Sequence, residues 1–460
     1  MDIANLFLTL MVLATLAFMI GRSRAFNVSD SRVSNLHSLP GYYGFYSLLL
    51  TVLPAVLIII GWIMLSPGVI ESRIISELPV EMQTQDKSQI NLLINDIKNH
   101  MQGYTSTGGN DALLSALAER YTHLERMNNI LLWTFSIGLS IIGLSISWLR
   151  IRRDFRAREK VESTVLTLLM LCSALAVLTT IGIVLSVLFE SIRFFQRVPI
   201  TEFLFGLEWS PQMAIRADQV GSSGAFGAIP LFAGTLLISF IAMVVAVPIG
   251  LMSSIYLAEY ANAKVRSVLK PVLEILAGIP TVVYGFFAAL TVAPFIRNLG
   301  GDIGLDVASE SALAAGLVMG IMIIPFVSSI SDDVITAVPR SLREGSYGLG
   351  ATQSETIVKV ILPAALPGIV GGILLAVSRA IGETMIVVMA AGLAAKLTAN
   401  PLEAVTTVTV QIVTLLVGDQ EFDSPKTLAA FALGLVLFAV TLILNVIALH
   451  VVKKYREQYD

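Results

Sequence analysis

The chain has 460 residues, of which 55% are hydrophobic and only 14% are charged. A soluble domain usually carries about 25% charged residues, so this composition excludes an ordinary soluble fold and indicates a membrane protein with many spans. The net charge is −3 and the sequence has no basic tract of the kind that binds nucleic acid. Cys172 is the only cysteine, so no disulfide can form within the chain.

Long apolar runs predict an all-α, polytopic membrane protein with about nine spans, because about 20 apolar residues are needed to cross a bilayer as a helix. These runs lie near residues 3–21, 43–66, 129–149, 163–189, 229–257, 271–296, 310–330, 366–394 and 428–451. No basic residue precedes the first run and arginines follow it, so we interpret it as an uncleaved helix and not as a secretory signal.

The distribution of Lys and Arg predicts the orientation, because loops on the cytoplasmic side are enriched in both. Dense basic clusters fall in alternate loops, at 22–32, 150–160, 264–266 and 340–359, and again in the tail after residue 452. We therefore expect the C-terminus in the cytoplasm and the N-terminus outside. The loop after the fourth run fits less well, because it carries Arg193, Arg197 and Arg216.

Two parts are expected, with the boundary between Arg150 and Lys160. Residues 1–160 contain about three spans and a polar segment at about 67–128, outside the cytoplasm. Apolar residues follow helical spacing on both sides of a glycine-containing stretch at 103–109, which predicts an antiparallel helical hairpin. The hairpin is either a structural cap or a docking surface for another protein. Residues 161–460 contain about six spans.

Arg379 and Glu383 fall inside the apolar run 366–394. A charge at the bilayer centre costs at least about 2.5–3.5 kcal/mol, so it needs a partner or a function. The two residues are one helical turn apart and are expected on one face with Gly368, Gly372 and Ala376, where small side chains let another helix come close. This arrangement predicts either a buried ion pair that fixes packing or a path for an anion.

Other charges and breaks in the apolar runs have simpler interpretations. Glu259 and Glu274 lie near the expected inner interface and are predicted to pair with Lys264 and Lys270. The segment Gly278-Ile-Pro280 interrupts an apolar run and is either a hinge or an ordinary kink.

The long loop at about 338–365 has an ordered series of helix signals. We expect a short helix over Ser341–Leu349 that ends at a left-handed Gly350. Thr352 and Glu355 then have capping-box spacing for a second short helix, and Pro363 is expected to break that helix before the next span. The loop is either an ordinary connection or a rigid projection that inserts into a partner's groove.

Motifs for chemistry are absent from the sequence. No Gly-x-x-x-x-Gly-Lys-Ser/Thr phosphate loop occurs, and the four histidines lack metal-ligand spacing. We therefore expect no enzymatic activity, no cofactor and no metal, with any ATP hydrolysis on a separate chain.

The spacing Glu344-x5-Gly350-x11-Leu362-Pro363 resembles the EAA loop of ABC-importer permeases, although Gly345 and Ser346 replace two usual alanines. Further segments resemble the PstC-type permease of the phosphate ABC importer over about residues 163–455, leaving 1–160 unexplained. They are Glu208–Pro211, Pro248–Leu251, Ile255–Tyr260, Leu269–Phe287 and Arg379–Met385.

The resemblance implies a six-helix ABC permease core that forms half of a phosphate path in the inner (plasma) membrane. Implied partners are a homologous second permease, an ATPase dimer and an extracytoplasmic phosphate-binding protein. Arg379 and Glu383 are implied in phosphate passage, as anion contact and counter-charge, since arginine's fork matches two phosphate oxygens. The positions implied in ATPase coupling are Arg343, Glu344, Gly350, Leu362 and Pro363.

Three alternatives stay open at this point. In the first, the chain is a permease for another oxyanion such as sulfate or molybdate. In the second, it is a membrane sensor or assembly protein that uses residues 1–160. In the third, it is a secondary transporter driven by an ion gradient. The last is disfavoured because no other carboxylate lies clearly at mid-depth in a span.

Overall fold

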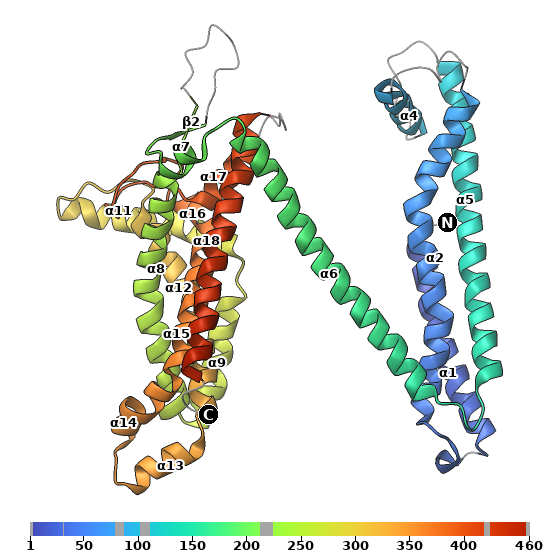
Figure 1. The fold of residues 1–460 in the computed structure, drawn as a ribbon, viewed down its shortest axis with the longest axis horizontal. Coiled ribbons are helices and arrows are strands. Elements are labelled where there is room, and N and C mark those ends of the chain that lie inside the picture. Colours follow the sequence, from blue (N-terminus) through green and yellow to red (C-terminus); the bar gives the residue numbers. More distant parts are fainter. Residues whose placement is uncertain are drawn as a thin grey trace. The chain divides into compact units, whose positions relative to one another are not determined.

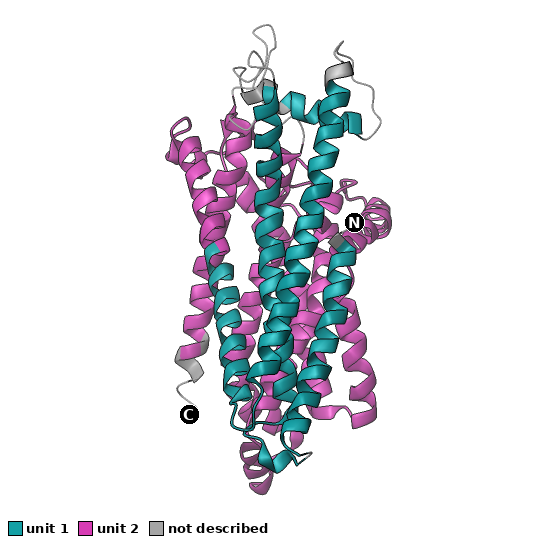
Figure 2. Cartoon of the chain, turned by 90° about the vertical axis from the view of Figure 1, so that its right-hand side faces the viewer, with its two compact units in different colours: residues 1–178 teal, residues 179–460 magenta. Residues whose placement is uncertain are grey.

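The computed structural model describes residues 3–30, 32–78, 87–101, 111–211, 224–417 and 424–456. They fall into two compact units, residues 1–178 and residues 179–460, which are coloured separately in Figure 2. The dividing point lies inside one continuous helix, α6 (Ala157–Phe195). The boundary expected at Arg150–Lys160 stays a prediction.

The all-α class is confirmed (Figure 1). The first unit contains α1 (Ile3–Val28), η1 (Val33–Asn35), α2 (Pro40–Glu77), α4 (Lys87–Met101), α5 (Asp111–Arg150) and the first part of α6. The second unit begins with the rest of α6, α7 (Ile200–Phe205), β1 (Trp209–Ser210), β2 (Ala225–Phe226), α8 (Ile229–Ile255), η2 (Tyr256–Tyr260), α9 (Ala263–Ala277), α10 (Thr281–Phe287), η3 (Ala288–Val292) and α11 (Ala293–Asp302). It continues with α12 (Ala312–Ala337), α13 (Arg340–Gly348), α14 (Gln353–Thr356), η4 (Ile357–Ile361), α15 (Leu362–Ile381), α16 (Met385–Ala390), α17 (Val408–Leu416) and α18 (Pro425–Arg456).

Nine helical segments among the described residues are long and apolar enough to cross a membrane, which confirms the predicted count. They span residues 4–28, 40–77, 114–150, 157–195, 229–260, 281–302, 312–337, 353–381 and 425–451. Two of the predicted runs are not single helices. The run 271–296 is divided at Gly278–Pro280, because α9 is a separate amphipathic helix, and the run 366–394 begins earlier and ends at Ile381.

In the first unit, α2 packs against both α1 and α5. Polar contacts are built into this apolar bundle: the Ser147 hydroxyl donates to the Ser47 hydroxyl at 3.0 Å. At one end, the loop before α6 is held to the beginning of α2, because the Tyr43 hydroxyl donates to the Phe155 carbonyl at 2.9 Å. This end therefore has one fixed arrangement of the α1–α2 and α5–α6 connections.

The polar segment at 67–128 contains the two predicted helices, α4 and α5, which pack against each other, and the end of α2 adds a third helix to them. α2 has 38 residues, about 57 Å at 1.5 Å per residue, so it extends well beyond a hydrocarbon core of about 30 Å. Its end packs with α4 and α5 around the buried Ile74, Ile97 and Leu117. Lys98 of α4 binds Glu71 of α2 at 2.9 Å. The predicted glycine turn at 103–109 lies outside the described residues.

In the second unit, α12 is the central helix, and 61% of its most apolar window is buried. On one side Gly316 and Gly320 lie against Ile241 and Val245 of α8, so closely that an added Cβ would clash. On the other side α15 packs against α12. Glycine at these positions lets the helix backbones come close, as in other membrane bundles.

The predicted stripe of small residues on α15 is confirmed. Gly368 lies against Val334 and Gly372 lies against Ile330, both on α12, and Ala376 is fully buried. A Cβ added to either glycine would overlap with those side chains. The close contact between α12 and α15 therefore depends on the small residues of α15. This contact fixes the last turn of α15, where Arg379 lies.

Candidate functional site

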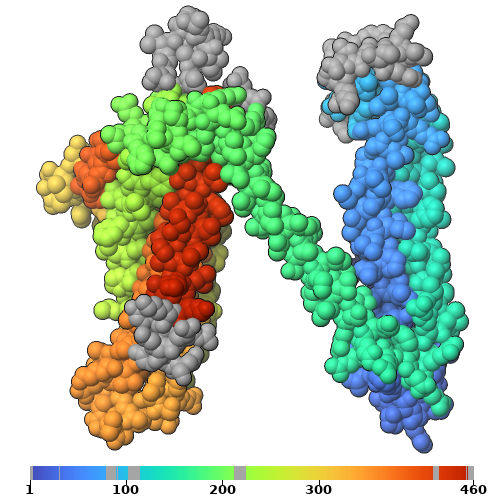
Figure 3. All heavy atoms as spheres, in the orientation of Figure 1, coloured from blue at the N-terminus to red at the C-terminus, as the bar shows by residue number. Residues whose placement is uncertain are grey.

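The segment between α12 and α15 protrudes from one end of the second unit (Figures 1 and 3). As predicted, a short helix, α13, comes first, and Gly350 follows it with a φ of 85°. The predicted capping box is also confirmed: the Thr352 side chain accepts from the Glu355 amide, and the Glu355 carboxylate accepts from the Thr352 amide. We call residues 338–365 the coupling segment from here on.

The predicted break at Pro363 is wrong, because the helix from Gln353 to Ile381 is continuous. Proline lacks an N–H and its ring clashes with the carbonyl four residues earlier. The chain avoids this clash with the wider turn of η4, in which the Leu362 amide bonds to the carbonyl of Ile357, five residues earlier. Leu362 then packs in a cluster with the buried Ile335 and Ile361, whereas Pro363 is exposed.

Arg343 points inward from the coupling segment. Its guanidinium lies 2.8 Å from the Glu259 carboxylate of η2 and donates to the Ile335 carbonyl at 2.6 Å. Only 6% of the Glu259 side chain is exposed. Gln353 adds a second link, because its amide donates to the Glu259 carbonyl at 2.6 Å. The prediction that Glu259 pairs with a lysine of α9 was therefore wrong.

The outward face of the coupling segment is partly apolar. Leu349 is 92% exposed, and Leu342 and Tyr347 are also exposed. Glu344 lies on this exposed helix too. Single exposed apolar residues are normal, but three on one nine-residue helix and its cap are more than such a short helix usually exposes.

Arg379 and Glu383 do not share one helical face, and this prediction was wrong. α15 ends at Ile381, and Gly382 and Glu383 are non-helical before α16 begins. The Glu383 carboxylate accepts from the Met385 amide at 3.1 Å, and its carbonyl accepts from the Thr409 hydroxyl at 2.9 Å. Glu383 therefore holds the interruption between two helices in place.

Arg379 lies in the last turn of α15 and is exposed. Its guanidinium is 5.7 Å from the centre of the Phe326 ring of α12, within the range of a cation–π contact. No carboxylate of the described residues forms an ion pair with it. Its charge is thus available to an anion, and the adjacent interruption is the kind of irregular backbone that occurs at membrane depth only inside protein or beside water.

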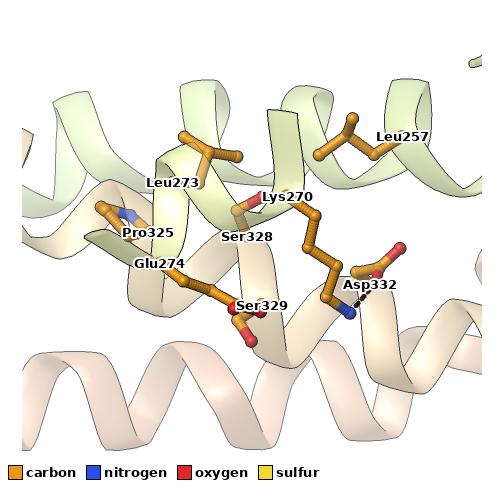
Figure 4. A pocket seen from close by; sticks show the side chains of 8 residues that line it. All are labelled: Leu257, Lys270, Leu273, Glu274, Pro325, Ser328, Ser329 and Asp332. Carbon is orange, nitrogen blue, oxygen red and sulfur yellow. Dashed lines mark hydrogen bonds and ion pairs between the residues drawn. The ribbon is translucent and has the colours of Figure 1, made fainter. Parts of the chain in front are cut away.

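Asp332 of α12 is a charged residue that the sequence analysis missed. Its carboxylate accepts from Arg266 at 2.9 and 3.0 Å and from Lys270 at 2.7 Å, while only 3% of its side chain is exposed. Lys270 and Asp332 line a hollow of about 10 Å³, about the room that one water needs. Figure 4 shows the side chains that line it and the bond between Lys270 and Asp332. The hydrogen bond that the Lys270 ammonium donates to Asp332 raises the pKa of Lys270.

Asp332 could have been found from its sequence position. The predicted seventh run stopped at residue 330, so Asp332 and Asp333 were counted as loop, although α12 continues to Ala337. The amphipathic character of α9, with Arg266 and Lys270 one turn apart, was the signal that pointed to an acidic partner on a neighbouring helix.

Two family models match the chain. Residues 7–179 match the model described as "Phosphate ATP-binding cassette transporter", and residues 246–457 match "Binding-protein-dependent transport system inner membrane component". The first match covers the part that the sequence resemblance left unexplained.

Full-length relatives decide the family. "Probable ABC transporter permease protein YqgH" of Bacillus subtilis (strain 168) is 32% identical over 306 residues, 66% of this chain and 93% of the relative. "Phosphate transport system permease protein PstC 1" of Mycobacterium tuberculosis (strain ATCC 25618 / H37Rv) is 33% identical over 280 residues, 55% of this chain and 81% of the relative. The chain belongs to the family of PstC-type ABC transporter permeases.

A member of this family is a multi-pass inner-membrane subunit that transports and does not catalyse, since ATP hydrolysis takes place on a separate chain. Permeases of this kind work together with another permease, an ATPase and a substrate-binding protein. Among solved structures, a chain of the bacterial alginate ABC transporter bound to alginate pentasaccharide-bound periplasmic protein is 16% identical, with a TM-score of 0.45, over 66% of this chain and 99% of that one. That likeness is too remote to carry an argument.

Proposed function

We propose that this permease carries inorganic phosphate and that Arg379 is the side chain that contacts the anion. The observation behind the proposal is that Arg379 is an exposed guanidinium beside a helix interruption, with an aromatic ring as its neighbour and no ion-pair partner among the described residues. A guanidinium offers two parallel N–H donors, which match two phosphate oxygens. The names of the relatives support phosphate as the anion.

Release of the anion requires a contact that is not too strong. Arg379 supplies a single cation, and Phe326 holds the guanidinium by its ring face. Glu383 enters the proposal as a positioning residue and not as a counter-charge, because its carboxylate is engaged with the Met385 amide. It keeps the interruption after Arg379 in one conformation.

The energy for transport is proposed to enter through the coupling segment. Leu342, Tyr347 and Leu349 supply exposed apolar contacts for a separate ATPase dimer, and Gly350 gives the sharp turn that presents them. This assignment places the coupling segment and the C-terminus in the cytoplasm. The remaining partners are a homologous second permease, which completes the path, and an extracytoplasmic phosphate-binding protein.

Uptake of labelled phosphate by the assembled importer tests the proposal, with sulfate and molybdate as competitors. Replacing Arg379 by Ala should reduce phosphate uptake at least tenfold, while Arg379→Lys should retain part of it because the charge remains but the fork is lost. Arg297→Ala is the matched control, since Arg297 is also exposed, on α11. Unchanged uptake in Arg379→Ala would remove this residue from the path, and competition by sulfate equal to that by phosphate would point to a general oxyanion permease.

A further inference from the structure

Unit 1 has an apolar groove at the end where the arginines gather. Ile20 of α1 forms one wall, and Leu144, Ser145, Trp148 and Leu149 of α5 form the rest, around a volume of about 420 Å³. The lining residues of α5 fall one turn apart, so the groove runs along the helix axis. A groove of this direction and chemistry fits an extended hydrocarbon chain that lies parallel to the helices.

Arg24 contacts Trp148, one of the residues that line the groove. It lies one turn after Ile20 on α1, and its guanidinium is 4.7 Å from the centre of the Trp148 ring. Its Nε is buried and has no hydrogen-bond partner. A buried donor without an acceptor is costly, so this nitrogen is the kind of group that a bound ligand satisfies.

The same end carries an excess of positive charge that the protein itself does not neutralise. Three arginines have acidic partners: Arg153 with Asp30, Arg156 with Glu159, and Arg158 with Glu162. Five others lack an acidic partner among the described residues. They are Arg22, Arg24, Arg32, Arg150 and Arg152. Asp154 also belongs to this end, as a single negative charge against five positive ones.

We propose that this groove binds an anionic phospholipid, with its phosphate at Arg24 and one acyl chain along Ile20, Leu144 and Leu149. The charge selects an anion, because a polybasic site beside a span attracts anionic lipids by about 1 kcal/mol per Lys or Arg. The length and apolar lining select a lipid over a free phosphate ion, which has nothing to place in the groove. Trp148 lies at the junction of both parts, as interfacial tryptophans do.

The site is separate from the proposed phosphate path, since all of its residues belong to the first unit. It assigns to this unit a binding function that does not depend on Arg379 or on the coupling segment. Lipid in this groove would contact both α1 and α5, the two helices that pack against α2.

Quenching of tryptophan fluorescence by brominated lipids measures occupancy of the groove directly. The full chain in detergent is titrated with brominated phosphatidylglycerol or brominated phosphatidylcholine. The quenching of Trp148 is obtained by subtracting the quenching measured in Trp148→Phe from that of the wild type. We expect quenching at a lower mole fraction of phosphatidylglycerol than of phosphatidylcholine. Arg24→Gln should raise the midpoint of the phosphatidylglycerol titration about fivefold, which is the effect of losing one cation. Arg24→Lys keeps the charge and should keep most of the preference for phosphatidylglycerol over phosphatidylcholine.

Two further variants separate the headgroup from the acyl chain. Ser145→Phe fills the groove without changing charge and should also raise the midpoint, whereas Lys160→Gln, which removes an exposed cation outside the groove, should not. Equal midpoints for the two lipids, equal effects of Arg24→Gln and Lys160→Gln, or displacement of the lipid by millimolar inorganic phosphate would each overturn the proposal. Absence of quenching by both lipids would mean that protein fills the groove, and would overturn it as well.

Discussion

The guanidinium of Arg343 and the carboxylate of Glu259 meet at 2.8 Å and join the coupling segment to η2, the widened helical turn that ends α8. Their positions in the sequence are 84 residues apart. Because Arg343 also donates to the Ile335 carbonyl of α12, α13 is fixed to two helices at once. A displacement of α13 by a partner therefore moves the ends of α8 and α12 together.

Breaking this pair should uncouple the importer. Arg343→Ala leaves a carboxylate that is 6% exposed without its cation, so we expect a loss of about 2 kcal/mol in stability. We also expect ATP hydrolysis to continue with fewer phosphate ions imported per ATP. The ratio of uptake to hydrolysis in proteoliposomes measures this effect.

The control for that experiment is Arg340→Ala, which removes an exposed arginine from the same helix. Exchanging the two charges, as Glu259→Arg with Arg343→Glu, should restore part of the lost stability. A normal ratio of uptake to hydrolysis in Arg343→Ala would show that the pair has no part in coupling.

Asp332 is expected to hold α9 against α12. Asp332→Asn removes the charge that two cations share and should cost about 2 kcal/mol, since the carboxylate is almost fully buried. Hydrogen exchange of the amides at 263–277 should become faster. Lys270→Met should have a smaller effect, because Arg266 still bonds to both carboxylate oxygens.

Asp333→Asn is the matched control for Asp332→Asn. Asp333 is 3.5 Å from Lys270 and largely exposed, so we expect little change in exchange. Similar acceleration in both aspartate variants would contradict a specific role for Asp332.

Leu349 should matter for assembly and not for folding. It is the most exposed of the apolar side chains on the coupling segment, so Leu349→Asp should change stability by less than about 0.5 kcal/mol. The variant should copurify with less ATPase than the wild type. Leu207→Asp, at an exposed leucine before β1, is the control and should copurify normally. Retention of the full amount of ATPase by Leu349→Asp would argue against docking at this surface.

The loop between α16 and α17 should respond to acid through Glu403. The hydrogen bond from Lys396 lowers the pKa of the Glu403 carboxyl below its ordinary value. The ionised carboxylate therefore stabilises the loop above that ordinary pKa, and this contribution is lost as the pH falls through the lowered pKa. Lys396→Met should move the titration to higher pH.

Infrared difference spectra of the carboxylate band, with Glu403→Gln as the reference, measure this titration. Lys426→Met, which removes a lysine from α18, is the control for the loss of one positive charge. The same titration midpoint in Lys396→Met and the wild type would show that Lys396 does not set the pKa.

Elements with local signals could be predicted from the order of the amino acids alone. Apolar length gave nine spans, and the capping box at Thr352 and the left-handed Gly350 defined the coupling segment, because each depends on a few neighbouring residues. The small residues of α15 likewise predicted a close helix contact, since only a backbone without bulky side chains lets another helix approach.

The pairing of charges, in contrast, could not be predicted without the folded arrangement of the helices. Glu259 was expected to pair with a lysine and pairs with Arg343, and Glu383 was expected to bind Arg379 and instead binds the Met385 amide. Local propensity also did not decide that the helix continues through Pro363, or that it stops at Ile381. These outcomes depend on packing between segments that are distant in the sequence. That packing determines which opposite charge lies beside a buried charge, and where the free-energy cost of interrupting a helix is small.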